Sequence, residues 1–138
     1  KSPVFYTFKL FSNNCLGTSV DTYVACDTFS TEQYKGISYL DATTVYSKEN
    51  NTVFINVINK SEDKAITTDI ISSTGNFSGK AEASVVNSDD LKAPFSIDKQ
   101  TQYVPVTNDV KLNGNKLSFT FPPHSFTQIK VNVKNNEK

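Results

Sequence analysis

The sequence predicts an all-β protein, folded as an antiparallel β-sandwich with a jelly-roll-like arrangement of strands. Short runs of alternating apolar and polar residues recur along the chain, and this alternation is the period of a strand with one buried face. Turns rich in Asn, Gly, Asp and Ser separate the runs roughly every eight to twelve residues. A chain of 138 residues has the length of one domain, so we expect a single core.

Residues 2–17, SPVFYTFKLFSNNCLG, break this pattern and predict a helix. Ser2 suits the N-cap, Pro3 suits the first turn, and Gly17 suits the end of the helix. The aromatic content of this segment exceeds what a short surface helix needs. Its apolar side would consist of Val4, Phe8 and Phe11, with Phe5 nearby.

The strands follow as runs of alternating or β-branched residues. In residues 52–59, Val53, Ile55 and Val57 share one face of the predicted strand. The same criterion predicts strands within residues 37–47, 52–59, 64–72, 79–86, 116–121 and 126–133.

Several of these strands are half polar. In residues 126–133, Thr127, Ile129, Val131 and Val133 alternate with polar residues. Such strands belong to antiparallel sheets that have one solvated face. The polar residues that would face solvent on this strand are Gln128, Lys130 and Asn132.

Two connections stand out between the strands. The Asn113–Gly114 pair predicts a tight hairpin, because Asn-Gly favours the turn that matches strand twist. Residues 87–106 contain Pro94 and Pro105, have weak periodicity and are rich in polar side chains. They predict a long connection that crosses from one sheet to the other.

Composition argues against two classes of partner. The 14 basic and 14 acidic residues cancel, so no net field favours nucleic acid or an anionic membrane. No apolar run approaches the roughly 20 residues that span a bilayer. We therefore expect no nucleic acid and no membrane among the partners.

The two cysteines leave two alternatives open. Cys15 and Cys26 could close a short disulfide loop in an oxidising compartment, or remain as two free thiols. A zinc site usually takes four ligands, and the chain has a single histidine. We therefore predict neither a metal site nor another cofactor.

His124 lies in the stretch LSFTFPPHSFTQIKV, residues 117–131. As a general base it would need an orienting carboxylate and a nucleophile, and Ser125 is its immediate neighbour. Adjacent residues on a strand point to opposite faces, which separates the two side chains. We interpret this segment as a corner: Pro122 and Pro123 end one strand, His124 and Ser125 complete the turn, and Phe126 starts the next strand.

Three stretches, in this order, resemble the C-terminal β-sandwich of α-L-arabinofuranosidases of glycoside hydrolase family 51. The stretches are YLDATTVYSKENNTVFINVINKS (39–61), VNSDDLKAPFSIDKQTQYVPV (86–106) and LSFTFPPHSFTQIKV (117–131). That family tends to show a strand of the type YLDVSAT, a loop that starts with Asn-Ser and ends in VVPV, and a last hairpin of the type LPPHSVTVL.

The resemblance implies a division of the chain at residue 17. Residues 1–17 would be the helix that closes a missing catalytic (β/α)8 barrel, and residues 18–138 would form the single sandwich domain. Phe5, Phe8 and Phe11 would then pack on the barrel of the same polypeptide or form a contact between copies. The absence of Met agrees with a processed product or a piece of a longer chain.

No position of this sequence matches the catalytic glutamates of the family. Asp41 is the acid inside an apolar strand, and we expect it to pair locally or face solvent. Asp89 and Asp90 lack the spaced ligand set of a known calcium loop. We therefore predict no catalytic residue in the chain. Its glutamates lie in polar turns or on a wet strand face and are Glu32, Glu49, Glu62, Glu82 and Glu137.

The resemblance implies a non-catalytic accessory domain. The whole enzyme would hydrolyse terminal non-reducing α-L-arabinofuranosyl residues of arabinan or arabinoxylan, with retention of configuration. It would be secreted or periplasmic.

Two alternatives come from other classes of protein. A carbohydrate-binding module usually stacks sugars on aromatic faces, often of Trp, which this chain lacks, so we expect weak polysaccharide binding at most. An immunoglobulin-like interaction domain would share the architecture, but the Cys…Trp…Cys arrangement is missing. The tyrosines that could serve a sugar site are Tyr6, Tyr23, Tyr34, Tyr39, Tyr46 and Tyr103.

Overall fold

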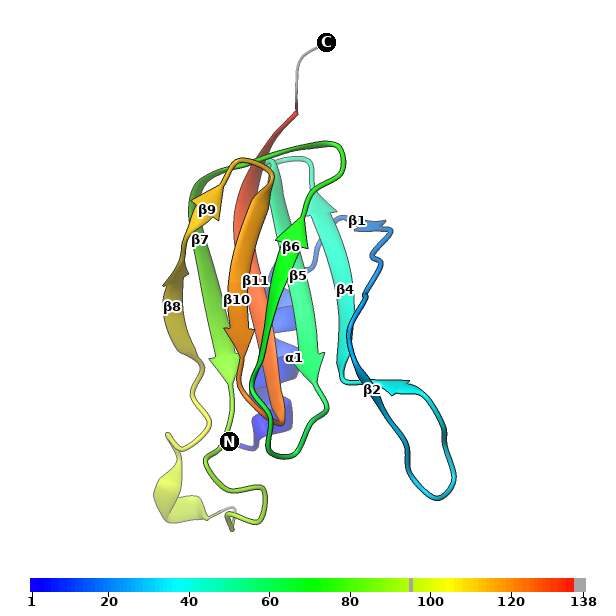
Figure 1. Ribbon diagram of the computed structural model, residues 1–138. Coiled ribbons are helices and arrows are strands. Elements are labelled where there is room, and N and C mark those ends of the chain that lie inside the picture. The colour runs from blue at the N-terminus through cyan, green and yellow to red at the C-terminus, as the bar shows by residue number, and fades with distance from the viewer. Residues whose placement is uncertain (95, 136–138) are drawn as a thin grey trace.

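The computed structural model describes residues 1–94 and 96–135, which form one α-helix, two facing antiparallel sheets and a small two-stranded sheet (Figure 1). The elements are α1 (Pro3–Asn14), β1 (Thr18–Val20), β2 (Thr28–Phe29), β3 (Ile37–Ser38), β4 (Leu40–Ser47), β5 (Thr52–Asn59), β6 (Ile66–Ile71), β7 (Gly75–Val86), a 3₁₀ turn (Ile97–Lys99), β8 (Val106–Val110), β9 (Leu112–Asn113), β10 (Lys116–Phe121) and β11 (Ser125–Asn135).

The larger sheet has the strand order β1-β4-β5-β11-β7-β8, and the smaller one has the order β6-β10-β9. All their pairings are antiparallel. The smaller sheet lies across the face of the larger one, and a short β2–β3 hairpin projects from the side (Figure 1). The core between the sheets includes Ile55, Ala83, Leu117, Phe121 and Ile129. The predicted antiparallel sandwich is therefore confirmed.

Helix α1 begins as the sequence predicts but ends earlier. The Ser2 hydroxyl accepts a hydrogen bond from the Phe5 amide, and Pro3 occupies the first turn. The helix ends at Asn14, so Gly17 does not terminate it. Gly17 is needed for a different reason: a Cβ atom there would lie 2.1 Å from the Tyr46 carbonyl oxygen on β4. Within the described residues, no helix is long and apolar enough to cross a membrane.

The strands predicted by alternation are present. Strands β5 and β10 coincide with the predicted runs 52–59 and 116–121. The hairpin at Asn113–Gly114 is also confirmed, because Asn113 pairs with Lys116 and Gly114 takes the left-handed conformation at φ 60°. Period-two burial therefore identified the strands that contribute to the core.

The predicted course of residues 87–106 is wrong. This connection joins β7 to β8, which are neighbours in the same sheet, so it does not cross between the sheets. The crossing lies instead at Lys111, between β8 on the larger sheet and β9 on the smaller sheet. The sequence obscured this because β8 is an exposed edge strand whose residues lack apolar alternation.

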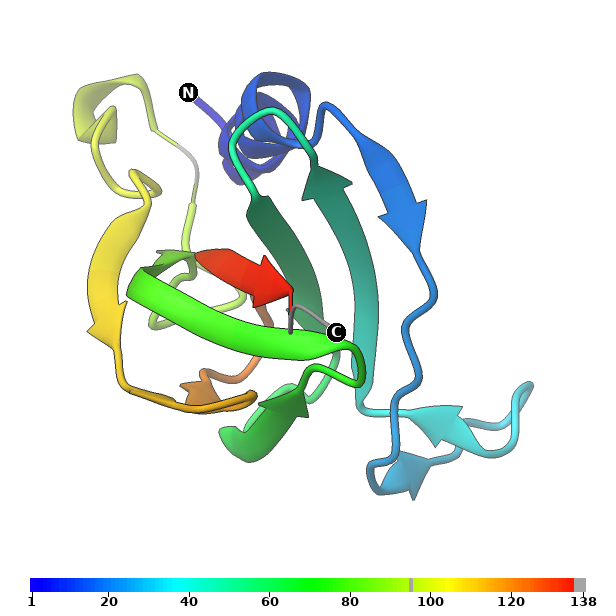
Figure 2. The ribbon, with the colours of Figure 1, turned by 90° about the horizontal axis from the view of Figure 1, so that it is seen from above.

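The predicted solvated face of β11 is also only partly correct. Lys130 is exposed, but Gln128 and its neighbour on β5, Asn56, are each only 3% exposed. Helix α1 covers this outer face of the larger sheet, on the side opposite β6 and β10 (Figure 2). Because the helix packs on the outer face, the side chains of Asn56 and Gln128 are buried there.

Candidate functional site

The predicted aromatic face of α1 is divided between solvent and the sandwich. The side chains of Val4, Phe5 and Phe8 are 60%, 40% and 68% exposed, and we call these three residues the docking face. The Phe11 ring instead packs on the Phe126 ring of β11, with 5.4 Å between the centroids. The helix thus uses Phe11 to contact the sheet and leaves an apolar face outside.

A buried polar cluster fixes the C-terminal half of α1 to the sheet. The Gln128 side-chain amide donates hydrogen bonds to the Asn56 Oδ1 atom at 2.8 Å and to the Leu10 carbonyl oxygen at 3.3 Å. Asn14 donates to the Gln128 Oε1 atom at 2.7 Å, and Asn56 donates to the Cys15 Sγ atom at 3.4 Å. We call Asn14, Cys15, Asn56 and Gln128 the helix latch. Sequence reasoning missed it, because its members are far apart in the chain.

The two cysteines are free thiols, which is one of the two alternatives that the sequence left open. Cys15 belongs to the helix latch on the outer face of the larger sheet. Cys26 packs against the core on the inner face, and its Sγ atom accepts a hydrogen bond from the Leu40 amide. In this structure the two thiols therefore lie on opposite faces of the larger sheet.

The segment around His124 forms the predicted corner between β10 and β11. Ser125 is the first residue of β11, and its hydroxyl donates to the Pro122 carbonyl oxygen at 2.7 Å. The His124 side chain points elsewhere: Nδ1 lies 2.7 Å from the Glu62 carbonyl oxygen, and Nε2 lies 2.7 Å from the Ser88 carbonyl oxygen. The two side chains are therefore engaged with different partners and do not form a nucleophile–base pair.

Asn59 is a buried corner residue that sequence reasoning missed. It is 1% exposed, and its Nδ2 atom lies within 3.1 Å of the carbonyl oxygens of Lys64, Phe121 and Pro122. Its Oδ1 atom accepts a hydrogen bond from the Ser61 amide. One side chain thus joins the β5–β6 loop to the β10–β11 corner.

The acidic residues that the sequence offered for chemistry are spread over the surface. Asp41, Asp89 and Asp90 are exposed, and Asp90 accepts a hydrogen bond from the Lys92 amide in its own turn. Within residues 1–94 and 96–135, no group of three or more His, Cys, Asp or Glu side chains could hold a metal ion. Glu32, Glu49 and Glu62 are exposed, Glu82 is half-buried, and Glu137 lies outside the described residues.

Two exposed ion-pair groups involve strand residues. Asp69 on β6 lies 2.7 Å from the Lys116 Nζ atom on β10, and the hydrogen bond from Lys116 lowers the pKa of Asp69 below its usual value. Lys80 lies 2.9 Å from Asp109 and 3.0 Å from Glu82, and the hydrogen bond to Asp109, followed by that to Glu82, raises its pKa. Both groups link neighbouring strands, and neither places two carboxyl groups in an apolar pocket.

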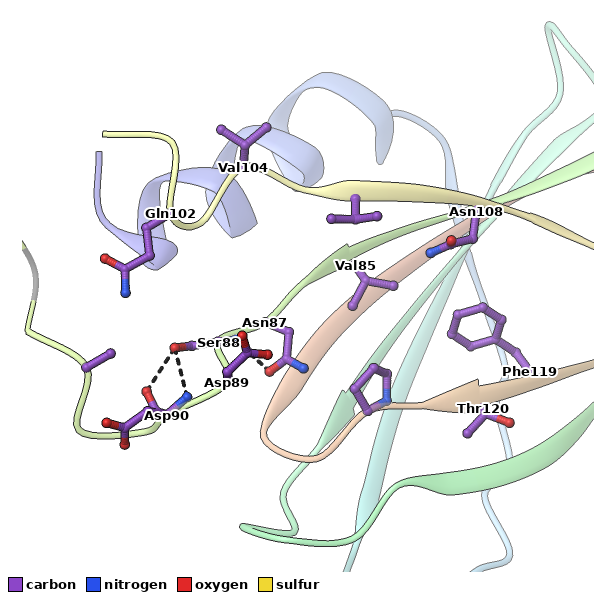
Figure 3. A pocket seen from close by; sticks show the side chains of 13 residues that line it. Val85, Asn87, Ser88, Asp89, Asp90, Gln102, Val104, Asn108, Phe119 and Thr120 are labelled. Atoms are coloured by element: carbon purple, nitrogen blue, oxygen red, sulfur yellow. Dashed lines mark hydrogen bonds between the residues drawn. The ribbon is translucent and has the colours of Figure 1, made fainter. Parts of the chain in front are cut away.

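A cleft of about 660 Å³ opens between the edge of β8 and strand β10 (Figure 3). The loop after β7 forms one wall, where the Ser88 hydroxyl donates to the Asp90 carbonyl oxygen and the Asn87 side chain accepts from the Ser88 amide. These side chains stabilise the loop itself. The Oε1 atom of Gln102 is buried at the cleft and has no hydrogen-bond partner among residues 1–94 and 96–135. Other lining residues include Val85, Asp89, Val104, Asn108, Phe119 and Thr120.

The fold defines the class of protein as an antiparallel β-sandwich that is preceded by a helix with an exposed apolar face. The model of the α-L-arabinofuranosidase C-terminal domain family matches residues 1–125. The chain therefore belongs to this family of C-terminal domains, as its resemblance to family 51 enzymes indicated.

Known relatives agree with this assignment. Intracellular exo-α-(1→5)-L-arabinofuranosidase 1 of Bacillus subtilis is 27% identical over 132 residues, which is 95% of this chain and 26% of that protein. The family 51 arabinofuranosidase of Xanthomonas axonopodis has the same fold, with a TM-score of 0.81 at 14% identity, over 94% of this chain and 26% of that one. The α-L-arabinofuranosidase of Thermotoga maritima matches with a TM-score of 0.77 at 22% identity. This match covers 93% of this chain and 28% of that one. This chain spans about a quarter of the length of these relatives.

Proposed function

We propose that this chain is the non-catalytic C-terminal domain of a larger α-L-arabinofuranosidase and that it packs on the catalytic barrel of the same polypeptide. The observation that carries the proposal is the docking face. A monomeric domain rarely leaves two phenylalanines and a valine together on one helix unless another surface covers them. The helix latch holds this helix on the sandwich, so the face is presented in a fixed orientation.

The reaction of the whole enzyme follows from the family and not from residues of this chain. We propose that the enzyme hydrolyses terminal non-reducing α-L-arabinofuranosyl residues of arabinan or arabinoxylan with retention of configuration. Retaining glycosidases use two carboxyl groups about 5–5.5 Å apart on either side of the scissile bond. In our proposal both groups belong to the barrel. The secreted or periplasmic location stays a prediction.

The first test is an assay of the purified 138-residue chain with an aryl α-L-arabinofuranoside. We expect no turnover above that of a mock purification, because the proposed domain contributes neither the acid nor the nucleophile. A full-length family 51 enzyme assayed in parallel shows that the substrate and conditions support turnover. Activity that co-purifies with the chain through successive columns would contradict the proposal.

A carbohydrate-binding function is the second candidate. Tyr23 and Tyr34, on either side of β2, are 92% and 65% exposed and could stack on sugar rings. Tyr39 and Tyr103 are less available: Tyr39 stacks on Phe29 at 4.9 Å, and Tyr103 is buried. Saturable binding of arabinan oligosaccharides that is lost when Tyr23 and Tyr34 are replaced by Ala would favour this candidate.

A further inference from the structure

The chain's one Asn-Gly pair, Asn113–Gly114, lies at the tip of the β9–β10 hairpin, at one end of the smaller sheet (Figure 1). Asn113 pairs with Lys116 across the turn, and Asn113 and Gly114 are both exposed. Gly114 has a φ of 60°, whereas the φ of Asn115 is not positive. A positive φ at the first loop residue alone is the pattern of a type II′ turn, which favours glycine there.

The two groups that react in asparagine deamidation are both unengaged at this tip. The nucleophile is the main-chain nitrogen of the following residue, and the electrophile is the side-chain amide carbon of the asparagine. Within residues 1–94 and 96–135, neither the Asn113 side chain nor the Gly114 amide has a hydrogen-bond partner. A Cβ atom built on Gly114 would meet nothing closer than the Asn76 side chain at 4.0 Å, so the nitrogen is open to approach.

Two other loop asparagines lack these conditions. Asn115 lies in the same turn, but its Nδ2 atom donates to the Ser72 carbonyl oxygen at 3.0 Å. At Asn87, the nitrogen that would have to attack is already engaged, because the Ser88 amide donates to the Asn87 Oδ1 atom at 2.7 Å. Glycine follows none of the other asparagines, so the attacking nitrogen at each of them belongs to a residue with a side chain.

We propose that Asn113 is a site of spontaneous deamidation in the folded chain. The Gly114 nitrogen attacks the Asn113 Cγ atom and closes a succinimide ring. The Cγ–Nδ2 bond breaks, and Nδ2 leaves as ammonia with the proton from the Gly114 nitrogen. Water then opens the ring at either of its carbonyl carbons, which yields an aspartate or an isoaspartate at position 113. Water is the sole co-reactant, and no atom is oxidised or reduced.

The two products act differently on the smaller sheet. Either one adds a carboxylate opposite Lys116, whose Nζ atom already lies 2.7 Å from Asp69. The isoaspartate also inserts an extra methylene group into the main chain at the residue that pairs with Lys116. The next residue, Gly114, accepts a hydrogen bond from the Phe77 amide at 2.9 Å, which ties the tip to β7 on the larger sheet. Isoaspartate formation therefore loosens the contact between the two sheets at this end.

The first test compares the rate of deamidation in the folded chain with the rate in the same chain unfolded in guanidinium chloride. Peptide mass spectrometry measures the conversion at Asn113 in both samples. A native domain is unfolded for only about 10⁻³–10⁻⁶ of the time, so a reaction of the native turn should stay within about a hundredfold of the unfolded rate. A folded-state rate lower than that would overturn the proposal, because the reaction would then need global unfolding.

The matched variants for this test are Asn113→Gln and Asn115→Gln. Glutamine keeps the side-chain amide but would have to close a larger ring, so Asn113→Gln should remove most of the conversion in the hairpin peptide. Asn115→Gln should leave that conversion in place, because Asn115 is not the reacting residue in the proposal. Conversion of the hairpin peptide that persists unchanged in Asn113→Gln would overturn the assignment.

Hydrogen exchange at the Phe77 amide tests the consequence for the sheet contact. We expect exchange about tenfold faster or more in the isoaspartyl fraction, separated by chromatography, than in the unmodified chain, because the bond to Gly114 is lost. Asn113→Asp adds the same charge without the extra methylene group, and its Phe77 amide should exchange like that of the parent. Unchanged exchange in the isoaspartyl fraction would overturn the loosening.

Discussion

At the scale of single residues, buried polar groups divide into those with partners and those without. Asn59 satisfies carbonyl groups at a corner, and Gln128 joins α1 to two strands. Thr127 is different: it is fully buried beside Ile129 and Val131, and its Oγ1 atom has no hydrogen-bond partner in the described structure. A buried hydroxyl without a partner loses its hydrogen bonds to water and gains none in the protein, so it lowers the free energy of unfolding.

We therefore expect Thr127→Val to stabilise the chain by about 1 kcal/mol, because valine has nearly the same shape and no hydroxyl to desolvate. The free energy of unfolding from urea titrations measures the change. The reciprocal variant, Val131→Thr, places a hydroxyl on the same buried face two residues away and should destabilise by about 1–3 kcal/mol. A Thr127→Val variant less stable than the parent would show that the hydroxyl has a partner.

The same residues show where prediction from sequence succeeds and where it stops. The alternation in residues 126–133 placed Thr127, Ile129 and Val131 on the core face, because period-two burial is a local property. It also predicted that Gln128 faces solvent, and this prediction is wrong. Helix α1, which is more than a hundred residues away in the chain, covers the Gln128 side chain. The helix latch and the bridge made by His124 depend on such distant contacts, so the candidate site was less predictable than the strands.

At the scale of elements, the smaller sheet is joined by side-chain pairs as well as by its backbone ladder. Strands β6 and β10 pair over six residues, and the ion pair between Asp69 and Lys116 crosses them on an exposed face. The sequence contained both strands, but it could not show that they pair, because pairing is set by topology. Chain order alone also placed the sheet crossing that follows β7 wrongly, within residues 87–106, when this crossing lies at Lys111.

The Asp69–Lys116 pair should make stability depend on pH in a defined direction. The folded-state pKa of Asp69 lies below its ordinary value of 3.8, so its contribution is fully present above that value and is lost as the pH falls through the folded-state pKa. A double-mutant cycle of Asp69→Asn and Lys116→Gln should give a small coupling at about pH 6 that declines in acid. It should also shrink in high salt, because both groups are exposed. A coupling that grows in acid would contradict the assignment.

At the scale of the whole molecule, the outer side of α1 exposes apolar side chains to solvent. The docking face lies on α1, on the opposite side of the larger sheet from β6 and β10. The family assignment gives a reason for it, since this chain spans only about a quarter of the relatives' length. The packing of Phe5 and Phe8 on a barrel, or on another copy, stays a prediction.

That packing can be tested with two substitutions of similar exposure. Phe8 is 68% exposed on α1 and Ile71 is 65% exposed on β6, so replacing either by Gln should change the stability of the isolated chain little. In the whole enzyme we expect Phe8→Gln to cost about 2 kcal/mol, because it removes an apolar side chain from the proposed interface, and Ile71→Gln to cost much less. Thermal unfolding of the four variants, each compared with its own unmodified parent, measures these changes. Equal effects in the whole enzyme would refute the docking face.

Gly17 has a consequence for how such a domain moves. Glycine between two folded units often provides a flexible joint, yet here the missing side chain brings the backbone against β4 at Tyr46. Two residues earlier, the Asn56 side-chain amide on β5 donates a hydrogen bond to the Cys15 Sγ atom. The link from α1 to β1 is therefore fastened to the larger sheet at both ends. We therefore expect α1 and the sandwich to move together as one rigid body, because residues 15–17 contact the sheet over the whole link.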